Sequence, residues 1–524
     1  MRNAELKYPI GVQSFEQIRT ENYLYIDKTD LVFKMINEGK YYFLSRPRRF
    51  GKSLLISTIK AYFQGRRDLF KGLAIDSLTD RWEQYPILHL DFNTAKYNSV
   101  EELHYIIDDM LRNWEEEYGI TEPAPTTALR FGHVIKAAYR KHGRNVVILI
   151  DEYDKPLTES ILDEELSANF RDELRALYSN LKSLDEYIRF ALLTGVTRFS
   201  RMTIFSGLNN LFDISMSDDY ESICGITESE MECCFRDGIE KIADKYHITY
   251  GEAIARLREW YDGYQFSDIH CDVYNPYSLL CALKNRKYEQ YWFATGTPKL
   301  LAQLISDNNY RFGSLQNIRT RKTSISQVDA YLTNPVALLL QTGYLTLKEW
   351  LPDTNEYRLG YPNREVEEGF LDYLYGYLMK ESGIDGQQTE EFSASLFRDD
   401  VIEGEPDRFM QRLSSLVSTL NLDPRGNMEA HYQNAVYLVF TLMGFTAGLE
   451  VHSAKGRSDM TVITSRYVYI FEFKTDSSSR AALDQIDAKG YAEPYLASGK
   501  AIFKIGVNFD TATRSLMPWL IERI

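Results

Sequence analysis

The chain has 524 residues, of which 44% are hydrophobic and 26% are charged, and its formal net charge at pH 7 is −15. This length is too great for one ordinary hydrophobic core, so about two to four globular domains are expected. The acidic balance argues against non-specific binding of the whole chain to nucleic acid or to an anionic membrane.

The cysteines and the apolar stretches exclude several other classes of protein. The five cysteines include no Cys-x-x-Cys pair, so neither a disulfide framework nor a zinc ribbon is expected. The first nine residues are polar and charged, unlike a signal peptide. The longest apolar stretch, residues 435–449, is short for a membrane span. We therefore expect a cytoplasmic protein that does not interact with a membrane.

Residues 41–60 have the pattern of a strand, a loop and a helix. Residues 41–44 are apolar and aromatic, and apolar residues recur at helical spacing after Ser53. Between them, Gly51-Lys52-Ser53 ends a P-loop, in which backbone N–H groups and a helix N-terminus bind phosphate. Lys52 is predicted to reach the β- and γ-phosphates of ATP, and the Ser53 hydroxyl to ligate Mg²⁺.

This loop departs from the usual P-loop pattern. Arg46 stands where the first glycine is expected, and Arg48 and Arg49 make the loop strongly cationic. Arg46, Arg49 and Gly51 are predicted to contribute to nucleotide binding with Lys52. Gly-Lys-Ser also occurs by chance, so this interpretation depends on a second motif downstream.

The second motif is an apolar, β-branched run over residues 145–150 that ends in Asp151 and Glu152. Such a run is typical of a buried parallel strand, and sites in open α/β sheets lie at the carboxyl ends of strands. Asp151 is predicted to hold the Mg²⁺ shell, and Glu152 to orient the attacking water. The alternative is that these acids only end a strand and start the next helix.

Further strands are predicted at 86–92 and 187–195, and helices at 101–118, 129–141 and 163–184. Alternation of strands and helices indicates an α/β protein with a parallel, doubly wound sheet.

The strand at 187–195 leads into a second group of polar residues. In ATPases of the AAA kind, the strand beside the acidic one ends in a polar residue that senses the γ-phosphate, and Thr194 suits that place. Arg198 or Arg201 is predicted to stabilise charge in the transition state. The alternative for both arginines is a surface ion pair.

From about residue 226 the pattern becomes mostly helical. Residues 338–347 with 357–359 are predicted to form a hairpin of a winged-helix-like arrangement. The middle region also contains two aromatic turn segments without a catalytic assignment, at 260–264 and 274–278. Its basic residues suit either phosphate contacts or a solvated loop; they are Arg311, Arg319, Arg321 and Lys322.

Residues 383–389 are polar and Gly-containing and suit a linker. We therefore expect three domains: a P-loop domain at 1–225, a helical middle region at 226–385 and a C-terminal α/β domain at 390–524.

The C-terminal domain carries a separate group of charged residues. Strands are predicted at 447–452, 456–463, 467–474 and 501–507, with helices at 428–440 and 481–489. Since strand residues two apart share a face, Glu472 and Lys474 project together. Asp459 lies one hairpin earlier and Glu429 in the first turn of the preceding helix.

This residue set suits a metal-dependent nuclease. Asp459 and Glu472 would hold Mg²⁺, Glu429 would add a ligand or fix one by hydrogen bonds, and Lys474 would position or deprotonate the attacking water. Glu-x-Lys alone is common and is usually a solvated strand face, so the order of the surrounding elements carries this interpretation.

The chain resembles the bacterial AAA-ATPase-like proteins that join a P-loop ATPase domain to a C-terminal PD-(D/E)xK nuclease-superfamily domain, which has a restriction-endonuclease-like fold. The resemblance spans nearly the whole chain, and in it Arg46 is the family's own form of the loop. The stretches that carry it are 8–11, 25–29, 46–53, 149–154, 194–198, 262–264, 274–278, 341–345, 360–363, 456–459 and 472–474.

The leading hypothesis is a cytoplasmic ATPase that gates a Mg²⁺-dependent nuclease, with DNA favoured over RNA as substrate. One alternative is an ATP-dependent switch or scaffold whose nuclease-like domain only binds nucleic acid or a partner, and the acidic composition favours it. Another keeps the nuclease and gives ATP a structural role without hydrolysis. An arginine acting in trans would require a homo-oligomer, which the sequence leaves open.

Overall fold

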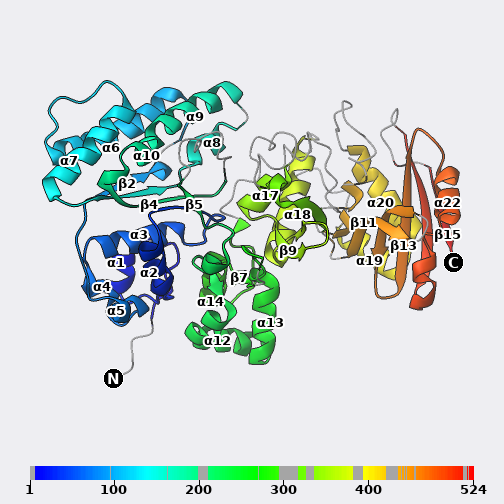
Figure 1. Ribbon diagram of the computed structural model, residues 1–524. Helices are drawn as coiled ribbons and strands as arrows, with labels where there is room; N and C mark the ends of the chain where they lie inside the picture. Colours follow the sequence, from blue (N-terminus) through cyan, green and yellow to red (C-terminus); the bar gives the residue numbers. More distant parts are fainter. Residues whose placement is uncertain are drawn as a thin grey trace. The chain divides into compact units, whose positions relative to one another are not determined.

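The structure of the chain is a computed structural model (Figure 1). It describes residues 6–94, 96–161, 163–198, 210–268, 271–293, 315, 317–325, 335–381, 394–419, 433, 435–437, 439–441, 443, 445–453, 456–510, 516 and 518–524. The chain divides into two compact units, Met1–Gly296 with Arg319–Glu365, and Thr297–Ile318 with Val366–Ile524. The division into three domains stays a prediction.

The first unit is built around a five-stranded parallel sheet in the order β2-β3-β4-β1-β5. Strands β3 and β1, on either side of the central β4, are buried along their whole length, as expected for parallel strands covered on both faces. This confirms the predicted parallel α/β sheet. The strands are β1 Tyr41–Ser45, β2 Ile87–Asp91, β3 Val146–Asp151, β4 Ile188–Gly195 and β5 Phe212–Asp213.

Helices cover both faces of this sheet (Figure 1). Helix α3 packs against β3 and β4 on one face, and α7 packs against β3 on the other, next to α6 and α9. These helices are α1 Phe15–Thr20, α2 Thr29–Glu38, α3 Lys52–Phe63, α4 Arg67–Phe70, α5 Ala74–Leu78, α6 Val100–Tyr118, α7 Thr127–His142, α8 Lys155–Glu159, α9 Glu164–Tyr178 and α10 Asn180–Ser183.

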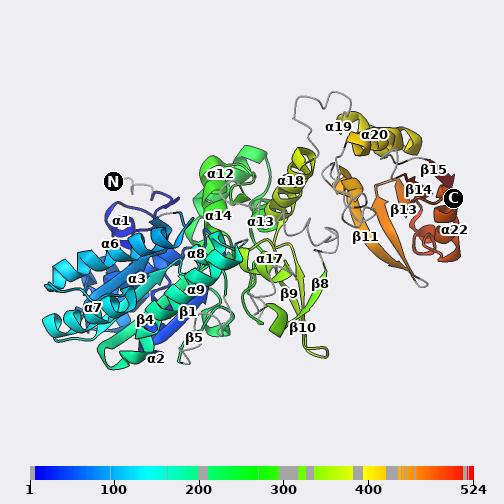
Figure 2. The same ribbon diagram turned by 90° about the horizontal axis from the view of Figure 1, so that it is seen from above.

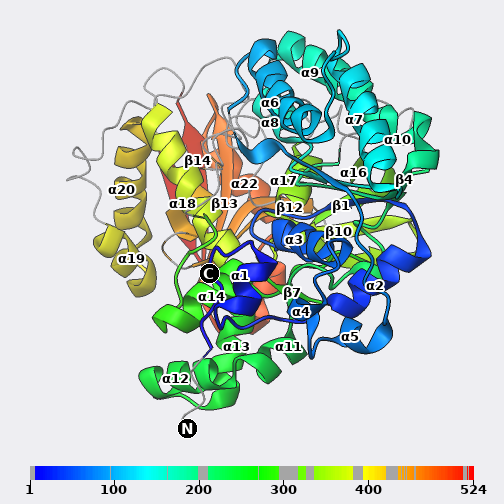
Figure 3. The ribbon, with the colours of Figure 1, turned by 90° about the vertical axis from the view of Figure 1, so that its left-hand side faces the viewer.

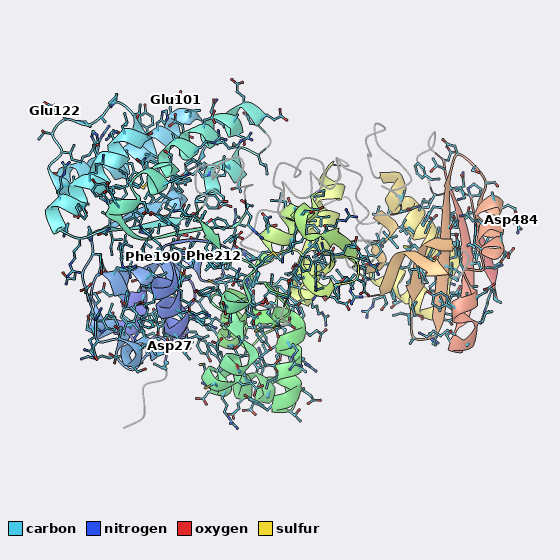
Figure 4. All side chains as sticks on the ribbon, viewed as in Figure 1. Asp27, Glu101, Glu122, Phe190, Phe212 and Asp484 are labelled. Carbon is cyan, nitrogen blue, oxygen red and sulfur yellow. The ribbon has the colours of Figure 1, made fainter. Side chains whose placement is uncertain are left out.

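Side chains that bind backbone N–H groups set several helix starts. Ser99 accepts from the N–H of Glu102 at the start of α6, and Thr126 accepts from Leu129 at the start of α7. Asp27 (Figure 4) accepts from the N–H and hydroxyl of Thr29 and from the N–H of Ala74, so it joins the starts of α2 and α5.

The rest of the first unit combines helices with a small sheet. Helices α12, α13 and α14 lie side by side (Figure 3), and β8, β10 and β9 form a three-stranded sheet in that order. The elements are β6 Ile226–Thr227, α11 Glu228–Cys234, α12 Arg236–Tyr246, α13 Tyr250–Tyr261, β7 Val273–Tyr274, α14 Pro276–Asn285, β8 Ile318–Arg321, α16 Lys322–Ile325, α17 Val336–Thr342, β9 Thr346–Leu351 and β10 Glu356–Gly360.

The hairpin of this region begins later than predicted. Residues 338–342 belong to helix α17, which ends at Gly343 with a φ of 92°, and the hairpin is β9 with β10. A short run of apolar residues does not distinguish a buried helix from a strand, and this is why the prediction was wrong here.

The second unit contains a mixed five-stranded sheet in the order β11-β12-β13-β14-β15 (Figure 2). Strands β13 and β14 are parallel, and the other neighbouring pairs are antiparallel. The elements of this unit, with α18 beginning two residues before it, are α18 Arg364–Glu381, α19 Ala394–Glu403, α20 Pro406–Thr419, β11 Thr446–Ser453, β12 Gly456–Ile463, β13 Tyr467–Thr475, α22 Ser479–Ala488, β14 Ala501–Phe509 and β15 Trp519–Arg523.

The two faces of β13 have different neighbours. Val468 and Ile470 pack against Leu483 and other residues of α22, whereas Tyr469 and Phe471 contact the ring of Phe409 in α20. By the same alternation, Glu472 and Lys474 belong to the face that carries α22.

One other prediction differs in detail. The helix expected at 163–184 is interrupted at Ser179, where α9 ends and α10 begins; the Ser179 hydroxyl donates to the carbonyl of Ala176, a local bond that competes with helix continuation. Strand β15 was not predicted. Among the described residues, no helix is long and apolar enough to cross a membrane.

Candidate functional sites

The P-loop connects the buried strand β1 to the first turn of α3. Gly51, just before α3, has a φ of 93°, a conformation that favours glycine, and it has no side chain to cap the helix. Arg49 also has a positive φ, of 69°. The first turn of α3 therefore presents backbone N–H groups beside Lys52 and Ser53, as an anion site requires.

Lys52 is buried and points toward the loop and the end of β3. Its Nζ donates to the carbonyls of Arg46 at 3.0 Å and Pro47 at 3.3 Å. It also lies 3.6 Å from the Glu152 carboxylate. One ammonium group is thus shared between the phosphate-binding loop and the acidic strand end.

The carboxyl ends of β3 and β4 bring the predicted acidic and sensing residues together. The Thr194 hydroxyl donates to Asp151 Oδ1 at 2.6 Å, and the N–H of Glu152 donates to the same atom at 3.1 Å. Glu152 has a φ of 52°, a left-handed conformation that turns the chain sharply after the strand. Lys52, Asp151, Glu152 and Thr194 therefore form one connected group.

A further carboxylate, Asp154, holds the turn after β4. It is buried and accepts hydrogen bonds from the N–H groups of Val196 and Thr197. A Cβ at Gly195 would lie 2.4 Å from an oxygen of Asp154, so this close approach requires glycine. Burial and the nearby charge of Glu152 raise the pKa of Asp154. The sequence indicated no role for this residue, because its donors lie in the turn after β4, 42 and 43 positions further along the chain.

Arg198 is positioned by two other segments of the first unit. Its guanidinium pairs with Asp213 of β5, with a separation of 2.6 Å. Its N–H donates to Gln341 Oε1 at 2.7 Å, and Gln341 Nε2 donates to the carbonyl of Ile325. The guanidinium is therefore paired with a carboxylate of its own chain.

Arg46 lies in the protein interior. Its guanidinium donates to the carbonyls of Ser45, Ser215 and Tyr220, and it stacks on the ring of Phe266 at 4.1 Å. Burial lowers the pKa of Arg46 to about 10. These contacts join the end of β1 to the chain that follows β5.

Each of the five loop residues from Arg46 to Phe50 contacts a residue from the later part of the first unit. Arg46 stacks on Phe266 and Arg49 on Tyr277; Phe50 makes edge contacts with Tyr264 and Phe266; the Trp292 indole donates to the carbonyl of Arg48 at 3.1 Å. Pro47 lies against Gly343, where a Cβ would be 2.7 Å from the proline ring. We call these five contacting residues the collar: Tyr264, Phe266, Tyr277, Trp292 and Gly343.

The collar was not predicted as part of a site. Four of its members fall in or beside segments that the resemblance had marked, 262–264, 274–278 and 341–345. Nothing local in those segments shows that they meet at the P-loop, because the contacts join residues more than 200 positions apart.

The second candidate site lies where β12 and β13 pair. Asp459 Oδ2 accepts from the N–H of Phe473 at 2.8 Å, and Lys474 Nζ donates to Glu472 Oε1 at 3.1 Å. Glu472 is 1% exposed and Lys474 is 29% exposed. On the next strand, Gly506 pairs with Glu472 and lets α22 approach, since a Cβ there would lie 2.3 Å from the carbonyl of Ser479.

The charge state of Glu472 suits a divalent cation. Burial and the neighbouring Asp459 charge raise the pKa of Glu472 to about 7, whereas Lys474 acts in the opposite direction. Its Oε2 atom is buried without a hydrogen-bond partner among the described residues. A cation between the two carboxylates would relieve both their repulsion and this unsatisfied oxygen.

Several predicted residues lie outside the described residues: Glu429, Arg201, Arg311 and the linker at 383–389. Within the part of the chain that the structure describes, no group of three or more His, Cys, Asp and Glu residues could hold a metal ion. The five cysteines are all free thiols.

Comparison with known proteins gives a family for each of the two regions that contain these residues. Residues 9–205 match the family described as predicted AAA-ATPase, and residues 427–519 match the PD-(D/E)XK nuclease superfamily. The first match contains the P-loop, Asp151 and Thr194. The second contains Asp459, Glu472 and Lys474.

The chain belongs to the family that joins these two domains. A protein of the bacterium Azotobacter chroococcum mcd 1, described as an uncharacterized protein in the vnfD 5' region, is 35% identical over 527 residues, and the match covers 99% of each chain. A solved structure of the Aeropyrum pernix ORC2 protein in ADPNP-ADP complexes is 11% identical, covering 68% of this chain and 98% of that one. Its TM-score of 0.28 is too low to support an argument.

Proposed function

We propose that this protein binds and hydrolyses ATP in its first unit and uses it to control Mg²⁺-dependent phosphodiester cleavage in its second. The observation that carries the ATP part is the connected group at the ends of β3 and β4: Lys52 beside Glu152, and Thr194 on Asp151. The residue types, their order and their contacts are those that phosphoryl transfer needs.

At the first site, Lys52 neutralises the β- and γ-phosphates, and Arg49 adds positive charge to the loop. Ser53 and Asp151 hold the Mg²⁺ shell, with the Thr194 hydroxyl fixing the Asp151 carboxylate. Glu152 accepts the proton of the attacking water, since it directly follows the strand end and its partly exposed carboxylate lies 3.6 Å from the Lys52 ammonium. The bound metal supplies charge stabilisation for the transferring phosphoryl group.

Arg46 and Arg198 have roles that differ from that of Arg49. Arg46 supports the loop from inside, because its guanidinium is taken up by backbone carbonyls and by Phe266. Arg198 reaches a transferring phosphate only if its pair with Asp213 opens. An arginine supplied in trans by a second copy of this chain would serve the same purpose, so a homo-oligomer belongs to the proposal.

At the second site, Asp459 and Glu472 hold Mg²⁺ and Lys474 orients the attacking water. A metal ion held there would supply a water of lowered pKa and positive charge beside the phosphate under attack. Lys474 is partly exposed beside the buried Glu472, so its ammonium can contact both the attacking water and a phosphate oxygen. The substrate is a nucleic acid, and DNA is favoured over RNA.

A second function remains a candidate because the net charge of the chain is −15. A strongly acidic protein repels a polyanion at long range. In this alternative, ATP drives a switch or scaffold, and the second site is a binding surface without cleavage.

The experiment is cleavage of supercoiled plasmid, single-stranded DNA and RNA with Mg²⁺ or Mn²⁺, with and without ATP. We expect cutting that ATP stimulates and that falls at least about 100-fold in Lys474→Ala, since a group used in the transition state is lost. Arg480→Ala, which removes an exposed cation from α22, is the matched control. Intact ATP hydrolysis without cutting of any substrate would favour the switch.

A further inference from the structure

Glu365 joins two parts of the chain that are far apart in sequence. Its Oε1 accepts hydrogen bonds from the N–H groups of Tyr291 at 2.5 Å and Trp292 at 2.7 Å. Glu365 is 1% exposed. It is the second residue of α18 and the last residue of the first unit, and the helix continues from Val366 in the second unit.

Trp292 connects the same point to the P-loop. Its backbone N–H donates to Glu365, while its indole Nε1 donates to the carbonyl of Arg48. The indole is 3% exposed and packs against the ring of Tyr344 at 5.1 Å, next to Gly343. Two hydrogen bonds of one residue, one from its backbone N–H and one from its indole, therefore join the phosphate-binding loop to the start of α18.

The loop carbonyls are also where Lys52 is bound. Lys52 donates to the carbonyls of Arg46 and Pro47, directly before Arg48. A phosphate that draws the ammonium away changes the hydrogen bonding of this loop backbone. Because each loop residue is held by the collar, such a change is transmitted to Trp292 rather than absorbed by a free loop.

We propose that Trp292 and Glu365 are positioning residues that couple nucleotide binding at the P-loop to helix α18. This inference rests on the proposed function, since it assigns the route by which ATP affects the second unit. Coupling of this kind is reciprocal: whatever ATP does to α18, a change at α18 does to ATP affinity.

The first test uses the full chain and amide hydrogen exchange over residues 366–381, with and without Mg²⁺ and ATP. We expect ATP to change exchange in the wild-type chain. Trp292→Phe keeps an aromatic ring and removes the indole N–H, and the ATP-dependent change should fall about fivefold, as the loss of one ordinary hydrogen bond predicts. Trp82→Phe is the matched control, because the buried indole N–H of Trp82 has no hydrogen-bond partner in the described structure.

The second test separates coupling from mere stability. Glu365→Gln keeps a carbonyl oxygen that can accept from both N–H groups, whereas Glu365→Ala removes the acceptor. The glutamine variant should keep the response of α18 to ATP and the alanine variant should lose it, while titration with a fluorescent ATP analogue still detects binding in both.

ATP binding without any change in residues 366–381 of the wild-type chain would overturn the coupling and leave the ATP site in place. An unchanged response in Trp292→Phe and Glu365→Ala would also overturn it. Absence of ATP binding to the wild-type chain would overturn the coupling together with the proposed function, and the titration tells these cases apart.

Discussion

The two candidate sites balance the charge of their carboxylates in different ways. In the first unit, Lys52 and Thr194 come from two elements other than the acidic strand β3 and contact Glu152 and Asp151. In the second unit, Lys474 lies two residues from Glu472 on the same strand. The first site is thus assembled by tertiary structure, and the second largely by one strand and its neighbour.

This difference has a consequence for cation binding. The first site contains a buried cation of its own, since the Lys52 ammonium lies 3.6 Å from the Glu152 carboxylate. In the second, burial and Asp459 outweigh Lys474, so the pKa of Glu472 is raised to about 7. We therefore expect the second site to depend more strongly on a bound metal for its charge state.

The largest expected effect is on the first site. Lys52→Ala removes the ammonium shared by the loop and Glu152, so ATP affinity should fall by at least about 100-fold, because a charge-assisted contact to phosphate is lost and Glu152 is left unpaired. Titration with a fluorescent ATP analogue measures this. Lys60→Ala, in the last turn of the same helix, is the control. Equal affinities in the two variants would remove Lys52 from the site.

The second effect concerns metal at the C-terminal site. Glu472→Gln keeps the shape of the side chain but removes its charge, so Mn²⁺ affinity in the absence of nucleotide should fall about tenfold to 100-fold. Calorimetric titration measures it, with Asp484→Asn on the exposed side of α22 (Figure 4) as the control. Unchanged affinity for Mn²⁺ in Glu472→Gln would contradict a metal site there.

A smaller effect is expected from the hydroxyl that joins β4 to β3. Thr194→Val keeps the volume but loses the hydrogen bond to Asp151, so kcat for ATP hydrolysis should fall about tenfold with little change in KM. Steady-state hydrolysis assays measure both. Thr58→Val removes a buried hydroxyl that donates to the carbonyl of Leu54 within helix α3 and lies 3.5 Å from the Tyr25 hydroxyl, and it should leave kcat unchanged. A change in KM alone would show that Thr194 acts on binding.

The smallest effect is the dependence of stability on pH. Burial raises the pKa of Glu365 to about 7, above its ordinary value. Between the ordinary pKa of a glutamate and about 7, Glu365 is protonated in the folded chain but ionised in the unfolded chain. The stabilisation that Glu365 contributes is therefore full below the ordinary pKa and is lost as pH rises through about 7. Burial, and to a smaller extent the charge of Glu365, raises the pKa of Tyr261, Tyr264, Tyr277 and Cys281 around it.

Glu365→Gln removes this titration. The unfolding temperature of the variant relative to the wild-type chain should rise by a few degrees between pH 5 and pH 8. Differential scanning calorimetry measures the shift. Glu259→Gln, which removes an exposed carboxylate paired with Arg364, should show no such trend. A constant difference between Glu365→Gln and the wild-type chain across this range would contradict the raised pKa.

Local pattern was sufficient for most of the first sheet. The runs that became β3 and β4 are continuous and apolar, and such runs in alternation with helices define a parallel sheet. Pattern failed at residues 338–342, where a short apolar run is helical, and at Ser179, where a single serine interrupts a helix. For residues 338–342, periodicity alone does not separate a buried helix from a strand. At Ser179, a side-chain hydroxyl competes with the backbone for a carbonyl.

The amino-acid sequence by itself determined the two phosphate-related motifs, their order along the chain, and the shared face of Glu472 and Lys474, because these depend on residue type and on the regular periods of strands and helices. Only the tertiary structure decided that Arg46 faces the interior, that Asp154 accepts hydrogen bonds from the turn after β4, and that the collar residues contact the P-loop. The physical reason is distance along the chain: contacts such as the hydrogen bond between Arg48 and Trp292, 244 positions apart, depend on how the sheet and its helices pack, which no local pattern encodes.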